Sequence, residues 1–126
     1  MNLVDSCGWL EYFAGGPNAS FFAPAIEDTA TLIVPTLCLF EVFKRILQQR
    51  NESDAMRAIG LMRQSRCVDL TDSLALGAAL VSIELKLTLA DSIILHTARR
   101  LDAVLWTQDA HFEGLPGVRF VRKTAG

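Results

Sequence analysis

The 126-residue sequence has few cysteines and no long apolar run, and each shortage excludes a class of protein. Its three cysteines are widely spaced and form no CxxC pair, so a thiolate zinc site is disfavoured and small core residues are expected. The longest stretch without a charged residue, 12–26, is interrupted by Gly15-Gly16-Pro17. A membrane-spanning helix needs roughly 18 consecutive apolar residues, so none is predicted. No basic segment precedes an apolar one as in a secretory signal, so we expect a cytoplasmic location.

A large excess of either charge is also lacking. The chain has 12 basic and 14 acidic residues and a net charge of −2, which does not by itself indicate a nucleic-acid-binding protein. If a metal neutralised four of the acids, 12 basic residues would face 10 acidic ones, a balance that permits a phosphate-bearing substrate. Hydrophobic residues make up 51% of the chain, which favours apolar surface for a partner in addition to a core.

Short apolar segments alternate with longer amphipathic ones along the whole chain. This alternation predicts an α/β fold with a parallel sheet, and residues 1–126 are expected to form one domain because no repeat or linker interrupts them. Strands are expected near residues 3–4, 32–34, 67–70, 103–106 and 118–121. Helices are expected over residues 6–14, 17–28, 36–49, 55–65, 74–83 and 90–101.

Four carboxylates occupy positions that meet in such a fold. Asp5 and Asp109 each follow an apolar strand, and Glu41 and Asp91 are expected in the first turns of helices. In a right-handed parallel sheet all four positions face the carboxyl edge of the strands. Grouped acids repel one another unless cations are present, and hard divalent cations accept oxygen ligands. The pattern therefore predicts a site for Mg²⁺ or Mn²⁺ rather than zinc, because no Cys or His joins the set.

Each carboxylate taken alone has a structural alternative. Asp5 is well placed to cap the helix that follows it, and Asp109 is typical of a turn after a strand. Glu41 and Arg45 have the i, i+4 spacing of a surface ion pair, although the apolar neighbours of Glu41 disfavour it. Asp91 follows Thr88 in a Thr-x-x-Asp arrangement that resembles a capping box. The prediction therefore depends on the four positions together.

The segments around these acids resemble the four signature regions of PIN domains. In order and spacing the set is similar to VapC toxins of bacterial and archaeal toxin–antitoxin pairs, over essentially the whole chain. The segments are Val4-Asp5-Ser6, Leu39-Phe40-Glu41-Val42, Leu89-Ala90-Asp91-Ser92-Ile93-Ile94 and Trp106-Thr107-Gln108-Asp109-Ala110-His111-Phe112.

The resemblance implies a PIN-like three-layer α/β/α fold whose parallel five-stranded sheet has the order 3-2-1-4-5. It also implies a metal-dependent endoribonuclease that hydrolyses RNA phosphodiester bonds. Asp5 and Asp91 would be the chief ligands of Mg²⁺, or alternatively Mn²⁺. Glu41 and Asp109 would complete the acidic pocket, and the Thr107 hydroxyl would support it.

The two histidines are not needed for this chemistry, since the mechanism requires no protein base. His96 is interpreted as a helix-face residue and His111 as a loop residue. Lys44 or Arg45, one turn after Glu41, are possible phosphate contacts, although solvated surface is the simpler interpretation.

The resemblance also implies protein partners. VapC toxins form homodimers and are inhibited by a VapB-type antitoxin, which lays a segment along a hydrophobic groove and reaches a basic side chain into the acidic pocket. Four aromatic residues are candidates for the groove, with core packing as an equal alternative for each: Trp9, Phe13, Phe21 and Phe22.

Other functions remain open from the sequence. A PIN-type RNA-processing nuclease without an antitoxin has the same acids, and a non-catalytic α/β binding module would carry them as structural residues only. A haloacid-dehalogenase-type phosphatase is disfavoured, because Cys7 stands where that class needs a second aspartate. A phospho-receiver would need an acid pair at the first strand and a late lysine, and neither is evident.

Overall fold

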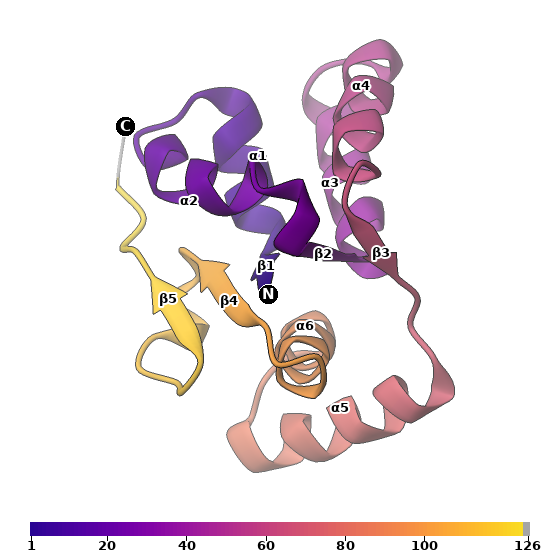
Figure 1. Ribbon diagram of the computed structural model, residues 1–126, viewed down its shortest axis with the longest axis vertical. Helices are drawn as coiled ribbons and strands as arrows, with labels where there is room; N and C mark the ends of the chain where they lie inside the picture. Colours follow the sequence, from indigo (N-terminus) through magenta and orange to yellow (C-terminus); the bar gives the residue numbers. More distant parts are fainter. Residues whose placement is uncertain (125–126) are drawn as a thin grey trace.

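The apolar start of the chain forms β1 (Asn2–Val4), the central strand of a parallel sheet (Figure 1). The computed structural model describes residues 1–124, and within them the sheet has five strands in the order β3-β2-β1-β4-β5. Every neighbouring pair is parallel. The other strands are β2 (Leu32–Pro35), β3 (Arg66–Val68), β4 (Val104–Thr107) and β5 (Val118–Phe120). The predicted strand order is confirmed.

Helices cover both faces of the sheet. They are α1 (Ser6–Ala14), α2 (Ala19–Ile26), α3 (Thr36–Gln49), α4 (Glu52–Met62), α5 (Asp72–Leu85) and α6 (Leu89–Arg100). Figure 1 shows α1 to α4 on one side of the strands and α5 with α6 on the other, which is the predicted three-layer arrangement. No helix in the described part of the chain is long and apolar enough to cross a membrane.

The central strands are buried because helices pack on both of their faces. Leu3, Ile33, Val34 and Leu105 are each 0% exposed. Strands of this kind show continuous apolar runs rather than alternation. This burial fixes the position of whatever follows each strand, which matters most for β1 and β4.

Helix ends largely follow the predicted capping signals. Asp5 is the N-cap of α1 and Gly15, with a positive φ of 64°, is its C-cap. Thr71 and Thr88 accept hydrogen bonds from backbone N–H groups at the starts of α5 and α6. Helix α2 is shorter than predicted, since it spans Ala19–Ile26 instead of residues 17–28.

Helix α3 corrects one prediction. The helix spans Thr36–Gln49 as predicted, with Pro35 at the N-cap position and no side-chain hydrogen bond there. Glu41 is consequently the sixth residue of α3 and lies in its second turn, not its first.

The cysteines do not share one environment, as the sequence suggested they would. Cys38 is buried in the core as predicted, but Cys67 is exposed on β3. Cys7 is half-buried, and its thiol lies beside the Asp5 carboxylate.

Candidate metal centre

The carboxyl ends of β1 and β4 lie at the topological switch point of the sheet. The helices that follow β1 and β2 cover one face, whereas those that follow β3 cover the other, so the direction of winding reverses between β1 and β4. Open α/β sheets bind ligands at such a reversal. Asp5 directly follows β1, Asp109 lies two residues beyond β4, and Asp91 is the third residue of α6. The fold therefore brings strand and helix acids to one edge.

Asp5 is buried, with 5% exposure, and hydrogen bonds hold its backbone and both of its carboxylate oxygens. Its backbone N–H donates to the carbonyl oxygen of Trp106 at 3.0 Å, which extends the pairing of β1 with β4. Its Oδ1 accepts from the backbone N–H of Ser6 at 2.7 Å. Its Oδ2 accepts from the Thr107 hydroxyl at 2.8 Å and from the Cys7 thiol at 3.4 Å. The carboxylate is thus fixed in one orientation before any ligand arrives.

Burial nevertheless dominates the electrostatics of Asp5. Desolvation raises the pKa of its carboxyl from 3.8 to about 6, and the negative charge of Asp91 adds to the rise. The hydrogen bonds from Thr107, Cys7 and Ser6 lower the pKa but do not offset the burial. Burial and the charge of Asp5 raise the pKa of the Cys7 thiol to about 12, so Cys7 remains a thiol donor. A cation near Asp5 would favour its charged form.

Asp91 and Asp109 lie close together at this edge of the sheet, together with His111. One ligand atom from each of the three residues lies within 4.8 Å of the others. His111 Nδ1 is 3.1 Å from Asp91 Oδ2 and 3.3 Å from Asp109 Oδ1. These two carboxylates raise the pKa of His111, first through the hydrogen bond to Asp91.

Backbone contacts hold this outer group in place. The N–H of Asp109 donates to the Thr107 hydroxyl oxygen at 2.9 Å, and the N–H of His111 donates to Asp109 Oδ1 at 2.9 Å. Thr107 therefore contacts both Asp5 and Asp109, since its hydroxyl donates to the first and accepts from the second. These two hydrogen bonds link the inner and the outer acid through one side chain.

Glu41 reaches the site from α3 through Ser6. The Ser6 hydroxyl donates to Glu41 Oε1 at 2.7 Å, while the Ser6 N–H donates to Asp5, so one residue links two acids. Within residues 1–124 the ion pairs include none between Glu41 and Arg45. The alternative in which Glu41 pairs with Arg45 on the surface is therefore not what the structure shows.

The predicted acids fall into an inner and an outer part of one site. Asp91 and Asp109 share the outer group with His111, whereas Asp5 lies deeper and close enough to Asp91 to be repelled by it. Glu41 lies beyond Ser6. The carboxylates of Asp91 and Asp109 fit a divalent cation, because their oxygens are hard donors and their repulsion, to which Asp5 adds, needs a positive charge.

The sequence interpretation missed three residues of this site. His111 was expected in a loop away from the chemistry, but it lies in a single 3-10 turn, Ala110–Phe112, with its ring against both carboxylates. The premise that no histidine joins the set is therefore wrong. Ser6 and Cys7 were read only as the start of α1. A usable signal was present for His111: an Asp-x-His spacing directly after a buried strand.

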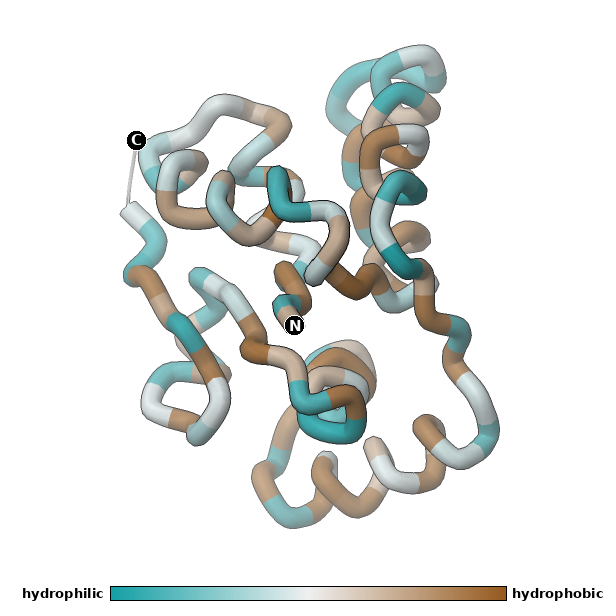
Figure 2. The backbone as a smooth tube through the Cα atoms, viewed as in Figure 1, coloured by the Kyte–Doolittle hydropathy of each residue, from teal (hydrophilic) through white to brown (hydrophobic). Residues whose placement is uncertain are grey.

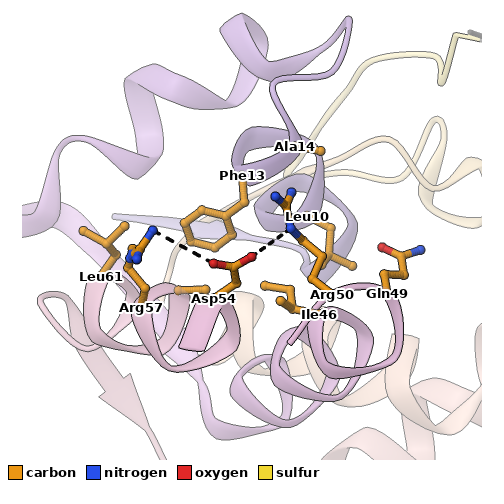
Figure 3. Close-up of a pocket in the computed structure, with 10 residues that line it drawn as sticks. Leu10, Phe13, Ala14, Ile46, Gln49, Arg50, Asp54, Arg57 and Leu61 are labelled. Atoms are coloured by element: carbon orange, nitrogen blue, oxygen red, sulfur yellow. Dashed lines mark hydrogen bonds and ion pairs between the residues drawn. The ribbon is translucent and has the colours of Figure 1, made fainter. Parts of the chain in front are cut away.

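A separate pocket of about 260 Å³ lies between α1, α3 and α4 (Figure 3). The side chains of Leu10, Phe13 and Leu61 are apolar parts of its wall. Its polar side includes Asp54, which is 2.9 Å from Arg50 Nε and pairs more distantly with Arg57. The pocket lies at the end of α1 opposite Asp5, so it is not the carboxylate site.

The four aromatic candidates for a groove divide between core and surface. Trp9 and Phe22 are 1% and 0% exposed, so for them the core alternative holds. Phe21 is half-buried and packs against the Trp106 ring with a centroid distance of 5.3 Å. Phe13 lines the pocket between α1, α3 and α4.

Comparison with known proteins identifies a family and several similar folds. The model of the PIN domain family matches residues 3–118. A toxin–antitoxin complex from Klebsiella pneumoniae contains a similar fold, with a TM-score of 0.81 and 23% identity over 94% of this chain and 96% of that one. The VapC20 toxin of Mycobacterium tuberculosis, described as cleaving the sarcin–ricin loop, has a TM-score of 0.77 and 15% identity over 92% and 95%. No curated protein matches at the level of sequence.

Proposed function

The chain belongs to the PIN domain family, and from this premise we propose that it is a metal-dependent endoribonuclease that acts as the toxin of a toxin–antitoxin pair. The observation that carries the proposal is the meeting of Asp91, Asp109 and His111 outside the buried Asp5, at the winding reversal of the sheet. RNA as the substrate class is supported by the similar fold of a toxin that cleaves the sarcin–ricin loop.

In this proposal Asp91 and Asp109 hold a divalent cation, Mg²⁺ or Mn²⁺, at the carboxyl edge of the sheet. When bound, such a cation supplies an activated water and stabilises charge on the scissile phosphate. Asp5 contributes a buried negative charge, and Thr107 and Ser6 fix its carboxylate so that no rearrangement is needed. Lys44 and Arg45 are exposed one turn beyond Glu41 and are suited to contact backbone phosphates of the substrate.

The proposed antitoxin would occupy the pocket between α1, α3 and α4. Its apolar wall accepts hydrophobic side chains, and Arg50 and Arg57 at the rim offer donors to a peptide's carbonyl or carboxylate groups. Helix α1 joins this pocket to Asp5 at its other end. A bound segment that followed α1 would therefore lead toward the acids, where a basic side chain would be attracted to them.

The proposed homodimer would use the outer face of α5. Leu76, Leu80 and Ile83 are spaced as one helical stripe and are 70%, 71% and 79% exposed. Figure 2 shows apolar residues along much of this helix. Leu80→Glu should shift the protein toward monomer in light scattering, whereas Met56→Glu on the exposed surface of α4 should not. Equal masses for both variants would count against this face.

The function is tested by cleavage of total RNA with the purified chain. Wild type should give discrete fragments in Mg²⁺ or Mn²⁺ and none in EDTA. Asp5→Asn and Asp91→Asn should each lose the fragments. Asp102→Asn is the matched control, because Asp102 is exposed in the turn before β4, at the opposite edge of the sheet. Intact RNA with wild type in every cation, or fragments that persist in the Asp5 and Asp91 variants, would contradict the proposal.

A further inference from the structure

His111 is held at the metal centre by its local structure. The 3-10 turn Ala110–Phe112 follows directly after Asp109, and the Phe112 side chain on it is 0% exposed. Because Phe112 is anchored in the core, the turn cannot rotate freely, and its neighbour His111 is directed outward, toward Asp91 and Asp109. The His111 side chain is 66% exposed, so a surface residue of this kind would ordinarily sample many rotamers. Here it contacts two acids instead.

The distances from the His111 ring nitrogen to the two carboxylates match the spacing of neighbouring ligands around a cation. Neighbouring ligands of an octahedral cation with bonds of about 2.1 Å lie about 3 Å apart. The separations from His111 Nδ1 to Asp91 Oδ2 and to Asp109 Oδ1 are 3.1 and 3.3 Å. Ionised carboxylates only accept hydrogen bonds, so in the metal-free protein Nδ1 is the donor to Asp91 Oδ2. A cation held by the two carboxylates would take the place of that proton.

We propose that His111 is a third protein ligand, through Nδ1, of the cation that Asp91 and Asp109 would hold, and that it biases the site toward Mn²⁺ over Mg²⁺. The inference rests on the proposed metal centre and adds to it a ligand outside the four acids. Binding would replace the Nδ1 proton, which leaves to solvent while the ring keeps its Nε2–H. Mg²⁺ prefers oxygen ligands and water, whereas imidazole is a better ligand for first-row transition metals.

The direct test is pulsed electron paramagnetic resonance of tag-free protein loaded with one equivalent of Mn²⁺ at pH 8. A ¹⁴N coupling to Mn²⁺ is expected in wild type and should disappear in His111→Gln. The control is His96→Gln, because His96 is the other of the two histidines and lies on α6 with its ring against Gly77. The coupling should persist in that variant. Wild type that binds Mn²⁺ without ¹⁴N coupling would overturn the role of His111 and leave the carboxylate site standing.

Calorimetry supplies a second readout that does not depend on activity. Since loss of even an outer-shell partner lowers metal affinity roughly 10–100-fold, His111→Ala should weaken Mn²⁺ binding by at least about 10-fold. Mg²⁺ binding should change by less than about threefold, because water replaces the nitrogen readily. Unchanged or tighter Mn²⁺ binding in His111→Ala would show that the ring competes with the cation, and would overturn the proposal. Absence of Mn²⁺ binding in wild type would overturn the metal centre itself.

Discussion

Replacing Asp5 with asparagine should stabilise the metal-free protein at neutral pH. The Asp5 carboxyl is 5% exposed and has its pKa raised from 3.8 to about 6 by burial, so its ionised form is disfavoured in the folded state. Asparagine has nearly the same shape and carries no charge. The variant therefore removes a buried charge that no cation neutralises under these conditions.

The magnitude follows from the difference in pKa between the folded and unfolded states. At pH 7.5 Asp5 is ionised in both states, and a rise of about two units lowers the free energy of unfolding by about 3 kcal/mol. As the pH falls through 6, the folded state takes up a proton before the unfolded state does, so this loss shrinks to about 1 kcal/mol near pH 4.5. The asparagine amide cannot accept all three hydrogen bonds that Asp5 accepts, which reduces the net gain at pH 7.5 to about 1–2 kcal/mol.

Urea unfolding in EDTA at pH 7.5 and pH 4.5 measures this difference. The advantage of Asp5→Asn over wild type should be larger at pH 7.5 by about 2 kcal/mol, and Asp102→Asn should show no such dependence. Addition of Mn²⁺ at pH 7.5 should stabilise wild type more than the variant, because binding to the folded state raises its stability. An asparagine variant that is less stable than wild type by the same amount at both pH values would refute the reasoning.

The remaining predictions concern packing and the link between two acids. Gly8→Ala should lower the free energy of unfolding by about 1–3 kcal/mol, because its Cβ would lie 2.7 Å from the buried Phe22 ring. Gly60→Ala, at an exposed and open position of α4, should instead raise it by about 0.5–1 kcal/mol; urea unfolding that gave both variants the same sign would contradict the packing. Ser6→Ala should reduce RNA cleavage because Glu41 loses its 2.7 Å hydrogen bond, and cleavage equal to wild type would make Ser6 structural only.

The sequence predicted the central strands well because burial on both faces leaves a simple apolar pattern, whereas the exposed β3 runs over Arg66–Val68 and not over the predicted residues 67–70. Leu32-Ile33-Val34 and Val104-Leu105-Trp106 can hardly be placed elsewhere than in a covered sheet. The order of the strands is a different matter, since periodicity does not say which strands are neighbours. That order came from the resemblance to PIN domains, and the structure confirms it.

Positions within the site were harder to predict, because side-chain direction depends on tertiary contacts. Glu41 was expected in the first turn of α3, but it is the sixth residue of a helix that begins at Thr36 and therefore lies in the second turn. His111 was missed because its direction is set by the burial of the next residue, Phe112. The position of Asp5 was easier to predict, because a residue that ends a buried strand and caps the following helix is fixed by both elements.

The surroundings of Asp5 connect the proposed activity with its proposed inhibition. Thr107, Cys7 and Ser6 all donate to this carboxylate, yet its pKa remains raised, so hydrogen bonds within the chain do not compensate for its burial. Positive charge from outside the chain would supply the missing compensation. A divalent cation supplies it in the proposed nuclease, and the basic side chain of an antitoxin would supply it in the proposed complex. Because both relieve the same repulsion at the same carboxylates, they should exclude each other, and cation binding should weaken as antitoxin is added.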